Sequence, residues 1–438
     1  MDDWQEEYKR KLISAEEAAQ KVKSGDTVAF TAGREAHSIG LAIAARLGDL
    51  QGIKVQVPSP GYDFGWYDPG WEDSFDITIS WPTATAQDML DERRCDVNLP
   101  LIIPFSTESD PPDVLLTEVS PPDDRGFCSF GASLWSKRRQ IKHTKLSIAE
   151  VNPKLIRTYG DNYVHVSEID FFVEHMSQAG QPGTGSLGGR AIKEPPAYQK
   201  QIVENVASLI KDGDTIQIGV GRTTEPLVRM GLFNGKNDIG IHSEATPPGI
   251  ISLVRDGVIN GSKKTLYPGQ VIVTSIGGGS KEEMQWCNGN PMFYLVDLLW
   301  LEDIRVIAQN DNMVSINNAL AIDMTGQITA ESIGPKLMSV AGGQIPFAFG
   351  ALLSKGGRSI TVLPSTAQDG KVSRIMTALP EGTAITLQRN IADLIVTEYG
   401  IANLRHKTLR QRCEQLINVA HPDFREELWK EAKKLYWP

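Results

Sequence analysis

One acidic side chain, Glu244, stands at the end of a segment whose residue types favour a β-strand. Residues 239–249 read Ile-Gly-Ile-His-Ser-Glu-Ala-Thr-Pro-Pro-Gly. The two prolines disfavour a helix and end strand pairing just beyond the apolar run. Glu244 is therefore predicted at the carboxyl-terminal end of a strand, the edge of an α/β sheet where ligands bind. Position alone leaves open the alternative of a solvated loop glutamate.

Glycine clusters are the second feature that could take part in chemistry. Gly219-Val220-Gly221 is predicted after a strand and before a helix, where exposed amides approach anions, although it lacks the third glycine and acidic partner of a nicotinamide fingerprint. Three more clusters follow Glu244, at 277–280, 342–344 and 354–358. Together they suit an extended anionic ligand such as coenzyme A, and a nucleotide would fit equally well. The candidate ligand-contacting residues are Gly219, Gly221, Gly278, Gly342, Gln344 and Lys355.

Histidine and cysteine do not point to a metal site. The seven histidines and four cysteines lack the spacing of metal ligands or of a redox pair. His242 is two residues from Glu244, so both share a strand face without needing to bond. We expect no metal, and we expect His242 to be structural.

Composition limits the partners. The chain has 438 residues and a formal net charge of -10, which argues against nucleic acid and anionic membranes. The acidic N-terminus lacks the apolar core of a signal peptide, and no apolar run reaches the length of a membrane span. These features predict a cytoplasmic protein whose cysteines are in the reduced thiol form.

A repeated pattern predicts two similar α/β halves. Gly25-Asp26-Thr27-Val28 recurs 188 positions later as Gly213-Asp214-Thr215-Ile216, and Gly33-Arg34 and Ile53 fall on Gly221-Arg222 and Ile241. We predict helices at 14–23, 38–47, 198–211 and within 408–435, and strands at 27–31 and 53–57. A glycine- and proline-rich linker, 180–196, separates an N-terminal domain, 1–185, from a C-terminal domain, 186–438.

The stretch 61–71 places five aromatic residues among glycines, so it is predicted to be a loop. Its rings would close a small core or a subunit contact, or would form an aromatic lid over a substrate pocket.

From about residue 120 onward, the chain carries a series of short motifs, at 120–123, 126–131, 148–152, 157–161, 240–244, 310–317, 326–327, 331–334, 342–344, 353–357 and 396–402. On these motifs the chain resembles the acetyl-CoA hydrolase/transferase family, the class I CoA-transferases that include 4-hydroxybutyrate and butyrate:acetate CoA-transferases.

The resemblance implies that Glu244 is the nucleophile, that Gly343 provides an oxyanion amide, and that acyl-CoA and a carboxylic acid are the substrates of a homo-oligomeric enzyme. The N-terminal domain would face the acyl group, and the C-terminal domain would carry the glutamate and the CoA-binding loops. A carboxylate with a reference pKa of about 4.3 is ionised at neutral pH and needs no general base. CoA would pass through a glutamyl-CoA thioester in a ping-pong reaction.

Two departures from the family pattern bear on acyl specificity. Ile345-Pro346-Phe347 follows the Gly-Gly-Gln turn, where the family has an acidic residue and then an aromatic one, and the segment 30–37 also differs. Both allow an acid bulkier than acetate. An acyl-CoA hydrolase on the same scaffold is the alternative function, and a non-catalytic CoA or nucleotide sensor is a third.

Overall fold

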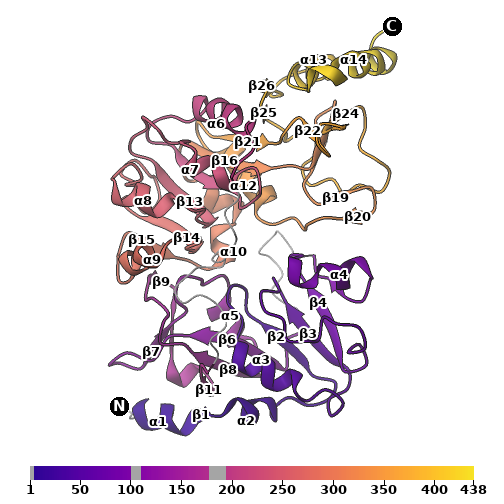
Figure 1. Ribbon diagram of the computed structural model, residues 1–438. Coiled ribbons are helices and arrows are strands. Elements are labelled where there is room, and N and C mark those ends of the chain that lie inside the picture. The colour runs from indigo at the N-terminus through magenta and orange to yellow at the C-terminus, as the bar shows by residue number, and fades with distance from the viewer. Residues whose placement is uncertain (1–3, 100–109, 177–193) are drawn as a thin grey trace. The chain divides into compact units, whose positions relative to one another are not determined.

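The computed structural model describes residues 4–99, 110–176 and 194–438, and these form two compact units (Figure 1). Unit 1 comprises Met1–Arg190 and Thr274–Trp300, and unit 2 comprises Ala191–Val273 and Leu301–Pro438. The predicted boundary at 185/186, like most of the predicted linker, lies outside the described residues. A single division there does not anticipate that residues 274–300 return to unit 1.

Unit 1 is built on a parallel eight-stranded sheet in which the strand β2 is central. Helices connect several of its strands, as in βαβ units, whereas a loop, residues 58–74, connects β3 to the parallel strand β4. Their order is β1 (Leu12–Ile13), β11 (Phe171–Glu174), β8 (Leu146–Val151), β6 (Val114–Val119), β2 (Thr27–Phe30), β3 (Ile53–Val57), β4 (Phe75–Ile79) and β5 (Asp96–Val97).

The remaining elements of unit 1 are short. Its helices are α1 (Trp4–Lys11), α2 (Ala15–Ala19), α3 (His37–Ala44), α4 (Gln87–Asp91), α5 (Lys137–Lys142) and α9 (Lys281–Cys287). Two further strand pairs are β7 (Phe127–Ser129) with β10 (Tyr163–His165), and β9 (Tyr159–Gly160) with β15 (Phe293–Leu295). Two 3-10 turns, at Ala84–Ala86 and Val166–Glu168, complete the unit.

Unit 2 is built on a sheet in which β12 is central and β13, which carries Glu244, is its neighbour. The strand order is β26 (Gly400–Asn403), β25 (Leu394–Thr397), β21 (Arg358–Val362), β16 (Met313–Asn318), β12 (Thr215–Ile218), β13 (Gly240–Ala245) and β14 (Val271–Ser275). The pairs β25–β21, β21–β16, β16–β12 and β12–β13 are parallel, and β26 is antiparallel to β25.

Helices and small sheets complete unit 2. The helices are α6 (Gln199–Ser208), α7 (Glu225–Arg229), α8 (Ile250–Arg255), α11 (Ile304–Ile307), α12 (Gln344–Leu353), α13 (Leu409–Asn418) and α14 (Pro422–Tyr436), while α10 (Leu298–Leu301) ends at its border. The small sheets contain β17 (Ala321–Asp323), β18 (Ile328–Thr329), β19 (Ser332–Ile333), β20 (Lys336–Leu337), β22 (Thr366–Ala367), β23 (Val372–Ser373) and β24 (Ile375–Met376).

The two large sheets share a strand order around their central strands. In unit 1, β2 lies between β6 and β3, and in unit 2, β12 lies between β16 and β13. Thr27 pairs with Lys54, whereas Thr215 pairs with Gly240, so the register of the second pair is shifted by two residues relative to the repeated sequence pattern. A shift of two keeps each side chain on the same face of the sheet.

Most predicted elements are confirmed. The strand Ile53–Val57 has the predicted bounds. The helix predicted at 14–23 begins with the predicted capping box between Ser14 and Glu17 but ends at Ala19, so its second half is wrong. The predicted helices at 38–47 and 198–211 appear as α3 and α6, each shorter at its C-terminal end. The C-terminal helix pair is α13 and α14.

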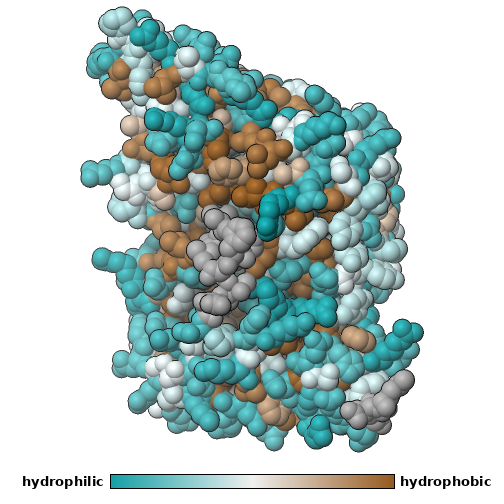
Figure 2. All heavy atoms as spheres, turned by 180° about the vertical axis from the view of Figure 1, so that it is seen from behind, coloured by the Kyte–Doolittle hydropathy of each residue, from teal (hydrophilic) through white to brown (hydrophobic). Residues whose placement is uncertain are grey.

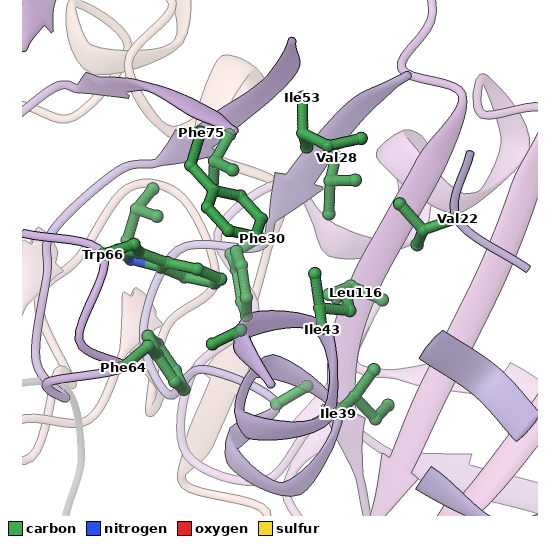
Figure 3. Packing of buried hydrophobic residues seen from close by; sticks show 14 of the residues in the cluster. Val22, Val28, Phe30, Ile39, Ile43, Ile53, Phe64, Trp66, Phe75 and Leu116 are labelled. Atoms are coloured by element: carbon green, nitrogen blue, oxygen red, sulfur yellow. The ribbon is translucent and has the colours of Figure 1, made fainter. Parts of the chain in front are cut away.

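The aromatic stretch 61–71 is a loop, as predicted, and its rings belong to the main core of unit 1 (Figure 3). Phe64, Trp66 and Tyr67 are 4%, 0% and 5% exposed. Trp66 packs against Phe75 and Phe64 with ring centroids 5.4 and 4.7 Å apart. Phe64, Trp66 and Tyr67 are therefore core residues, and they belong to the main core of unit 1 instead of the small separate core that the sequence predicted.

The surface seen in Figure 2 is mainly polar, with apolar residues gathered in the upper half of that face. Among the residues that the structure describes, no helix is both long and apolar enough to span a membrane.

Candidate active site

Glu244 is the second-last residue of β13, at the carboxyl-terminal edge of the parallel strands of unit 2. Pro247 and Pro248 follow, and Gly249 in the left-handed conformation starts α8. The flanking residues Ser243 and Ala245 are buried, whereas Glu244 keeps partial exposure. Glu244 is therefore fixed at the end of a rigid strand, as predicted from the proline pair, and the residue keeps partial exposure.

A second carboxyl group, Glu302, lies against Glu244, and the two side chains share a hydrogen bond. Glu302 belongs to the short link between α10 and α11, and it is also partly exposed. This residue is not among those predicted from the sequence. It follows an apolar stretch of four residues with no periodic pattern, and a single sequence gives no sign that it contacts Glu244.

Gly343 is the N-cap of α12, and its backbone N–H donates a hydrogen bond to the Glu244 carboxylate. A Cβ on Gly343 would lie 2.6 Å from Glu302 Oε1 and 2.7 Å from Glu244 Cδ, closer than real Cβ contacts. The backbone conformation of Gly343, φ -65° and ψ -2°, is ordinary for any residue. Glycine is therefore needed here for space, because the helix end approaches both carboxyl groups.

The electrostatics of this carboxyl pair, Glu244 and Glu302, are unequal. Desolvation raises the pKa of both groups, and the charge of Glu244 raises the pKa of Glu302 further, well above its ordinary value. The N–H of Gly343 and the hydrogen bond with Glu302 act in the opposite direction on the pKa of Glu244. The positive end of the α12 dipole also favours a negative charge at this place. The pKa of Glu302 is therefore raised further than that of Glu244, so Glu302 is the member that retains a proton more readily.

Two buried basic groups belong to β13 or contact it ahead of Glu244. The ring of His242 is fully buried, and its Nε2 lies 3.0 Å from the carbonyl oxygen of Leu301, the residue before Glu302. Burial lowers the pKa of His242 to about 3, so the ring is neutral. Lys264 Nζ donates to the Ile241 carbonyl oxygen at 2.7 Å. The prediction that His242 is structural is confirmed, since its ring ties the Glu302 segment to β13.

The glycines after β12 lie at the same edge of the sheet as Glu244. Gly219 and Gly221 approach Asn317 and Asn318 so closely that a Cβ on either glycine would clash with the facing amide. Asn317 and Gln217 bind each other through two amide hydrogen bonds of 3.0 and 2.9 Å. This packing accounts for the glycines structurally and also leaves exposed Val220 between them at the rim.

The other predicted ligand residues lie in three places. Gly342 and Gln344 flank Gly343 at the start of α12, and Gln344 is buried. Lys355 lies beyond the opposite end of that ten-residue helix, highly exposed and 3.7 Å from Asp311. Gly278 belongs to unit 1. The structure therefore brings Gly342, Gly343 and Gln344 to the carboxyl pair and places Lys355 at the other end of the helix.

Unit 1 contains its own buried ionisable cluster, at the carboxyl-terminal ends of β2, β6 and β8. Arg34 Nε donates to Glu118 Oε2 at 2.7 Å, and Glu150 pairs with His175. Lys137 is 1% exposed, and burial lowers its pKa to about 8. This edge is where ligands bind in parallel sheets. The sequence prediction of an acyl-facing N-terminal domain stays a prediction.

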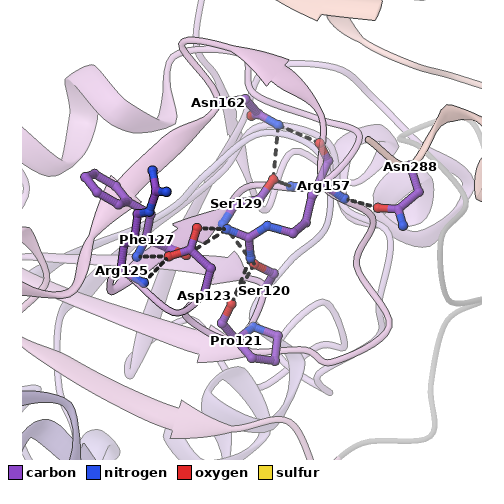
Figure 4. A network of polar contacts seen from close by, with 10 residues as sticks. Ser120, Pro121, Asp123, Arg125, Phe127, Ser129, Arg157, Asn162 and Asn288 are labelled. Atoms are coloured by element: carbon purple, nitrogen blue, oxygen red, sulfur yellow. Dashed lines mark hydrogen bonds and ion pairs between the residues drawn. The ribbon is translucent and has the colours of Figure 1, made fainter. Parts of the chain in front are cut away.

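Several motif residues of unit 1 serve the fold instead (Figure 4). Arg157 donates to the Ser120 hydroxyl at 3.0 Å, to Asp123 Oδ2 at 3.0 Å and to the Phe127 carbonyl oxygen at 2.8 Å. Its backbone N–H donates to Asn288 Oδ1 at 2.8 Å. Arg157 thus fastens the turn at 120–129 to the segment that leads into β9.

The described part of the chain contains no group of three histidine, cysteine or acidic side chains that could hold a metal ion.

Comparison with known proteins identifies the family. Residues 279–432 match the acetyl-CoA hydrolase/transferase C-terminal domain. The 4-hydroxybutyrate coenzyme A transferase of Clostridium kluyveri is 40% identical over 447 residues, which cover 99% of this chain and 100% of that protein. The chain belongs to the acetyl-CoA hydrolase/transferase family. Relatives at 31–40% identity over almost the whole chain are named CoA-transferases, so this family member is an enzyme of the CoA-transferase class.

Solved structures of similar proteins confirm the α/β fold class. RipA from Yersinia pestis has a TM-score of 0.88 and 30% identity, with 100% of both chains covered. A 4-hydroxybutyrate CoA-transferase (abfT-2) from Porphyromonas gingivalis has a TM-score of 0.79 and 32% identity, with 99% of this chain and 100% of that chain covered. The open parallel sheets of this family member therefore have well-matched counterparts.

Proposed function

We propose that this enzyme moves CoA from an acyl-CoA to a carboxylic acid by a ping-pong reaction through a thioester on Glu244. One observation carries the proposal: a partly exposed glutamate at the sheet edge receives the N–H of Gly343 at the start of a helix. An ionised carboxylate attacks without a general base, and a hydrogen-bond donor is already in position for charge on its oxygen.

The first half-reaction has two steps. A Glu244 carboxylate oxygen attacks the carbonyl carbon of the acyl-CoA, the C–S bond breaks, and a mixed anhydride and the CoA thiolate form. The thiolate sulfur then attacks Glu244 Cδ, the bond from Cδ to the acyl oxygen breaks, and the acid leaves as its carboxylate. A second carboxylate reverses both steps. The number of thioester bonds is unchanged, so the exchange needs no ATP.

The cofactor of this reaction is coenzyme A itself, as a co-substrate. Gly219, Gly221, Gly342 and Gln344 are the residues that we propose to contact it, because their backbones line the edge that carries Glu244. Close approach of backbone to an anionic ligand is the role that glycine-rich turns suit. Contacts of CoA with Gly278 and Lys355, a cytoplasmic location and a homo-oligomer stay predictions.

Intact-protein mass spectrometry tests the proposal. After incubation with acetyl-CoA, butyryl-CoA and a panel of branched and aromatic acyl-CoAs, the wild type should gain the mass of one CoA less one water, and Glu244→Ala should gain nothing. Borohydride reduction should remove CoA from the adduct. A wild type that forms no adduct with any donor would end the proposal.

Hydrolysis of the acyl-CoA on the same scaffold is the alternative function. The dependence of the rate on an added carboxylate acceptor distinguishes it from CoA transfer. A transferase consumes acyl-CoA at a rate that depends on an added carboxylate and releases a new acyl-CoA. A hydrolase releases free CoA at the same rate whether or not the acid is present.

A further inference from the structure

Glu302 raises a chemical question that the proposed exchange leaves unanswered. Two carboxyl groups share a hydrogen bond at a place that the N–H of Gly343 also reaches. A hydrogen bond between carboxyl groups needs one proton, because two carboxylates have only acceptors. One member of the carboxyl pair is therefore an O–H donor aimed at the other.

We propose that Glu302 is a catalytic residue whose carboxylic acid O–H, together with the N–H of Gly343, binds the oxyanion that forms on Glu244 when CoA attacks Glu244 Cδ. This inference rests on the proposed function and assigns a further donor to it. The two donors converge from separate elements, the α10–α11 link and the start of α12.

The step balances without proton transfer. The thiolate sulfur forms a bond to Glu244 Cδ, and the π electrons of the glutamyl carbonyl move onto its oxygen. That oxygen now carries a full charge and accepts from the Glu302 O–H and the Gly343 N–H. When the carbonyl re-forms, the bond from Cδ to the departing carboxylate breaks, and the proton is still on Glu302. The same donors serve the reverse attack by the acceptor carboxylate.

The surroundings keep this proton on Glu302. On β13, His242 is neutral. Lys264 is held three residues before Glu244, where its Nζ donates to the carbonyl oxygens of Ile241 and Gln270. The next residue, Asp303, is turned to the start of α11, where it accepts the N–H of Arg305 at 2.8 Å. In the described residues, the group that interacts with Glu302 through charge is Glu244.

The carboxyl pair works with one proton. At a pH below the first ionisation of the pair, Glu244 is protonated and cannot attack. At a pH above the second ionisation, Glu302 has lost the proton that it donates, and its charge repels the oxyanion. The rate should therefore pass through a maximum with pH, and the alkaline limb belongs to the pair as a coupled unit.

Three variants test the assignment: Glu302→Gln, Glu302→Ala and the control Asp303→Asn. Gln keeps an N–H donor but cannot ionise, Ala removes the donor, and Asp303→Asn makes the same carboxyl-to-amide change one residue away, at a helix cap that Asn also fills. The measurements are kcat against pH and the rate of adduct formation by mass spectrometry.

Glu302→Gln should keep kcat within about tenfold of the wild type at neutral pH, because its amide N–H replaces the O–H. It should also lose the alkaline limb. Glu302→Ala should lose about 10²- to 10³-fold in kcat, the cost of removing one oxyanion donor. Asp303→Asn should follow the wild type throughout. Burial lowers the pKa of Lys264 to about 7, so this group also titrates in the pH range of the assay. The effect of Glu302 is therefore measured as the difference between the pH profiles of the wild type and Glu302→Gln.

Three results would overturn the inference: Glu302→Gln as slow as Glu302→Ala, an unchanged alkaline limb in Glu302→Gln, or Glu302→Ala within threefold of the wild type. The Gln variant decides the matter even if the Ala variant does not fold. Adduct formation by the wild type together with any of these results would reject the role of Glu302 alone. A wild type without adduct would reject the proposed function as well.

Discussion

Adding a single methyl group at Gly343 is a direct test of the geometry around Glu244. In Gly343→Ala, the new Cβ would stand 2.7 Å from Glu244 Cδ and 2.6 Å from Glu302 Oε1, whereas ordinary contact begins at 3.4 Å. Because the backbone at Gly343 is in the right-handed helical region, alanine adds no backbone strain. The whole effect should fall on the two carboxyl groups.

The expected size follows from the displacement. To reach 3.4 Å, Glu244 Cδ must move by about 0.7 Å away from the N–H of Gly343. Reactive groups need to be held within about 0.5 Å of their productive geometry, and a misplacement of about 1 Å can cost about 10²-fold in rate. We therefore expect kcat to fall about 100-fold, which corresponds to about 2.7 kcal/mol in the activation barrier.

The assay is steady-state exchange between an acyl-CoA and a carboxylate, with the thermal midpoint of unfolding as a check on the fold. Gly61→Ala is a matched control, because the Gly61 N–H also donates to a buried carboxylate, Glu35, yet its Cβ would lie at an ordinary 3.5 Å from Glu35 Oε2. That variant should keep kcat within about twofold. If Gly343→Ala keeps kcat within threefold of the wild type while folding normally, the close approach does not matter and the reasoning is wrong.

Two further predictions concern stability. Asp214→Asn leaves the largely buried Arg358 without its carboxylate and should lower the free energy of unfolding, measured in urea, by about 3 kcal/mol. As a control, Lys9→Ala breaks the exposed pair with Glu6 and should leave that free energy almost unchanged. Equal effects of the two substitutions would contradict the argument from burial. The pKa of His242 is lowered to about 3 in the folded protein, so below pH 6.5 the unfolded chain binds a proton that the folded ring does not. The free energy of unfolding should therefore fall as the pH drops from 6.5 towards 3, and His242→Gln should flatten that decline in urea titrations. An identical pH slope in both proteins would refute this prediction.

What could be predicted from sequence was what short-range chemistry determines. The strand at 53–57 alternates buried and exposed residues, the capping box at Ser14 is a local hydrogen-bond pattern, and the prolines after Glu244 fix the end of β13. Each of these signals lies within a few residues, so no knowledge of the rest of the fold is needed to read it.

What could not be predicted depends on contacts between distant segments. Glu302 belongs to no recognisable sequence motif, and only its contact with Glu244 in the folded chain marks it as a site residue. Lys355 was selected because positive charge suits an anionic ligand, but it follows the C-terminal end of α12, away from the end that meets Glu244. Composition shows which groups are present, whereas only the course of the chain shows which end of a helix carries them.

The return of residues 274–300 to unit 1 has a consequence for how the protein is made. This segment supplies β15, which pairs with β9, and the buried side chains of Phe293 and Leu295. During synthesis from the N-terminus, unit 1 cannot be completed until residue 300 has left the ribosome, and by then the first stretch of unit 2, up to Val273, has already emerged. Unit 1 therefore cannot finish folding before part of unit 2 has been synthesised, and a fragment ending at residue 185 lacks part of the unit to which it belongs.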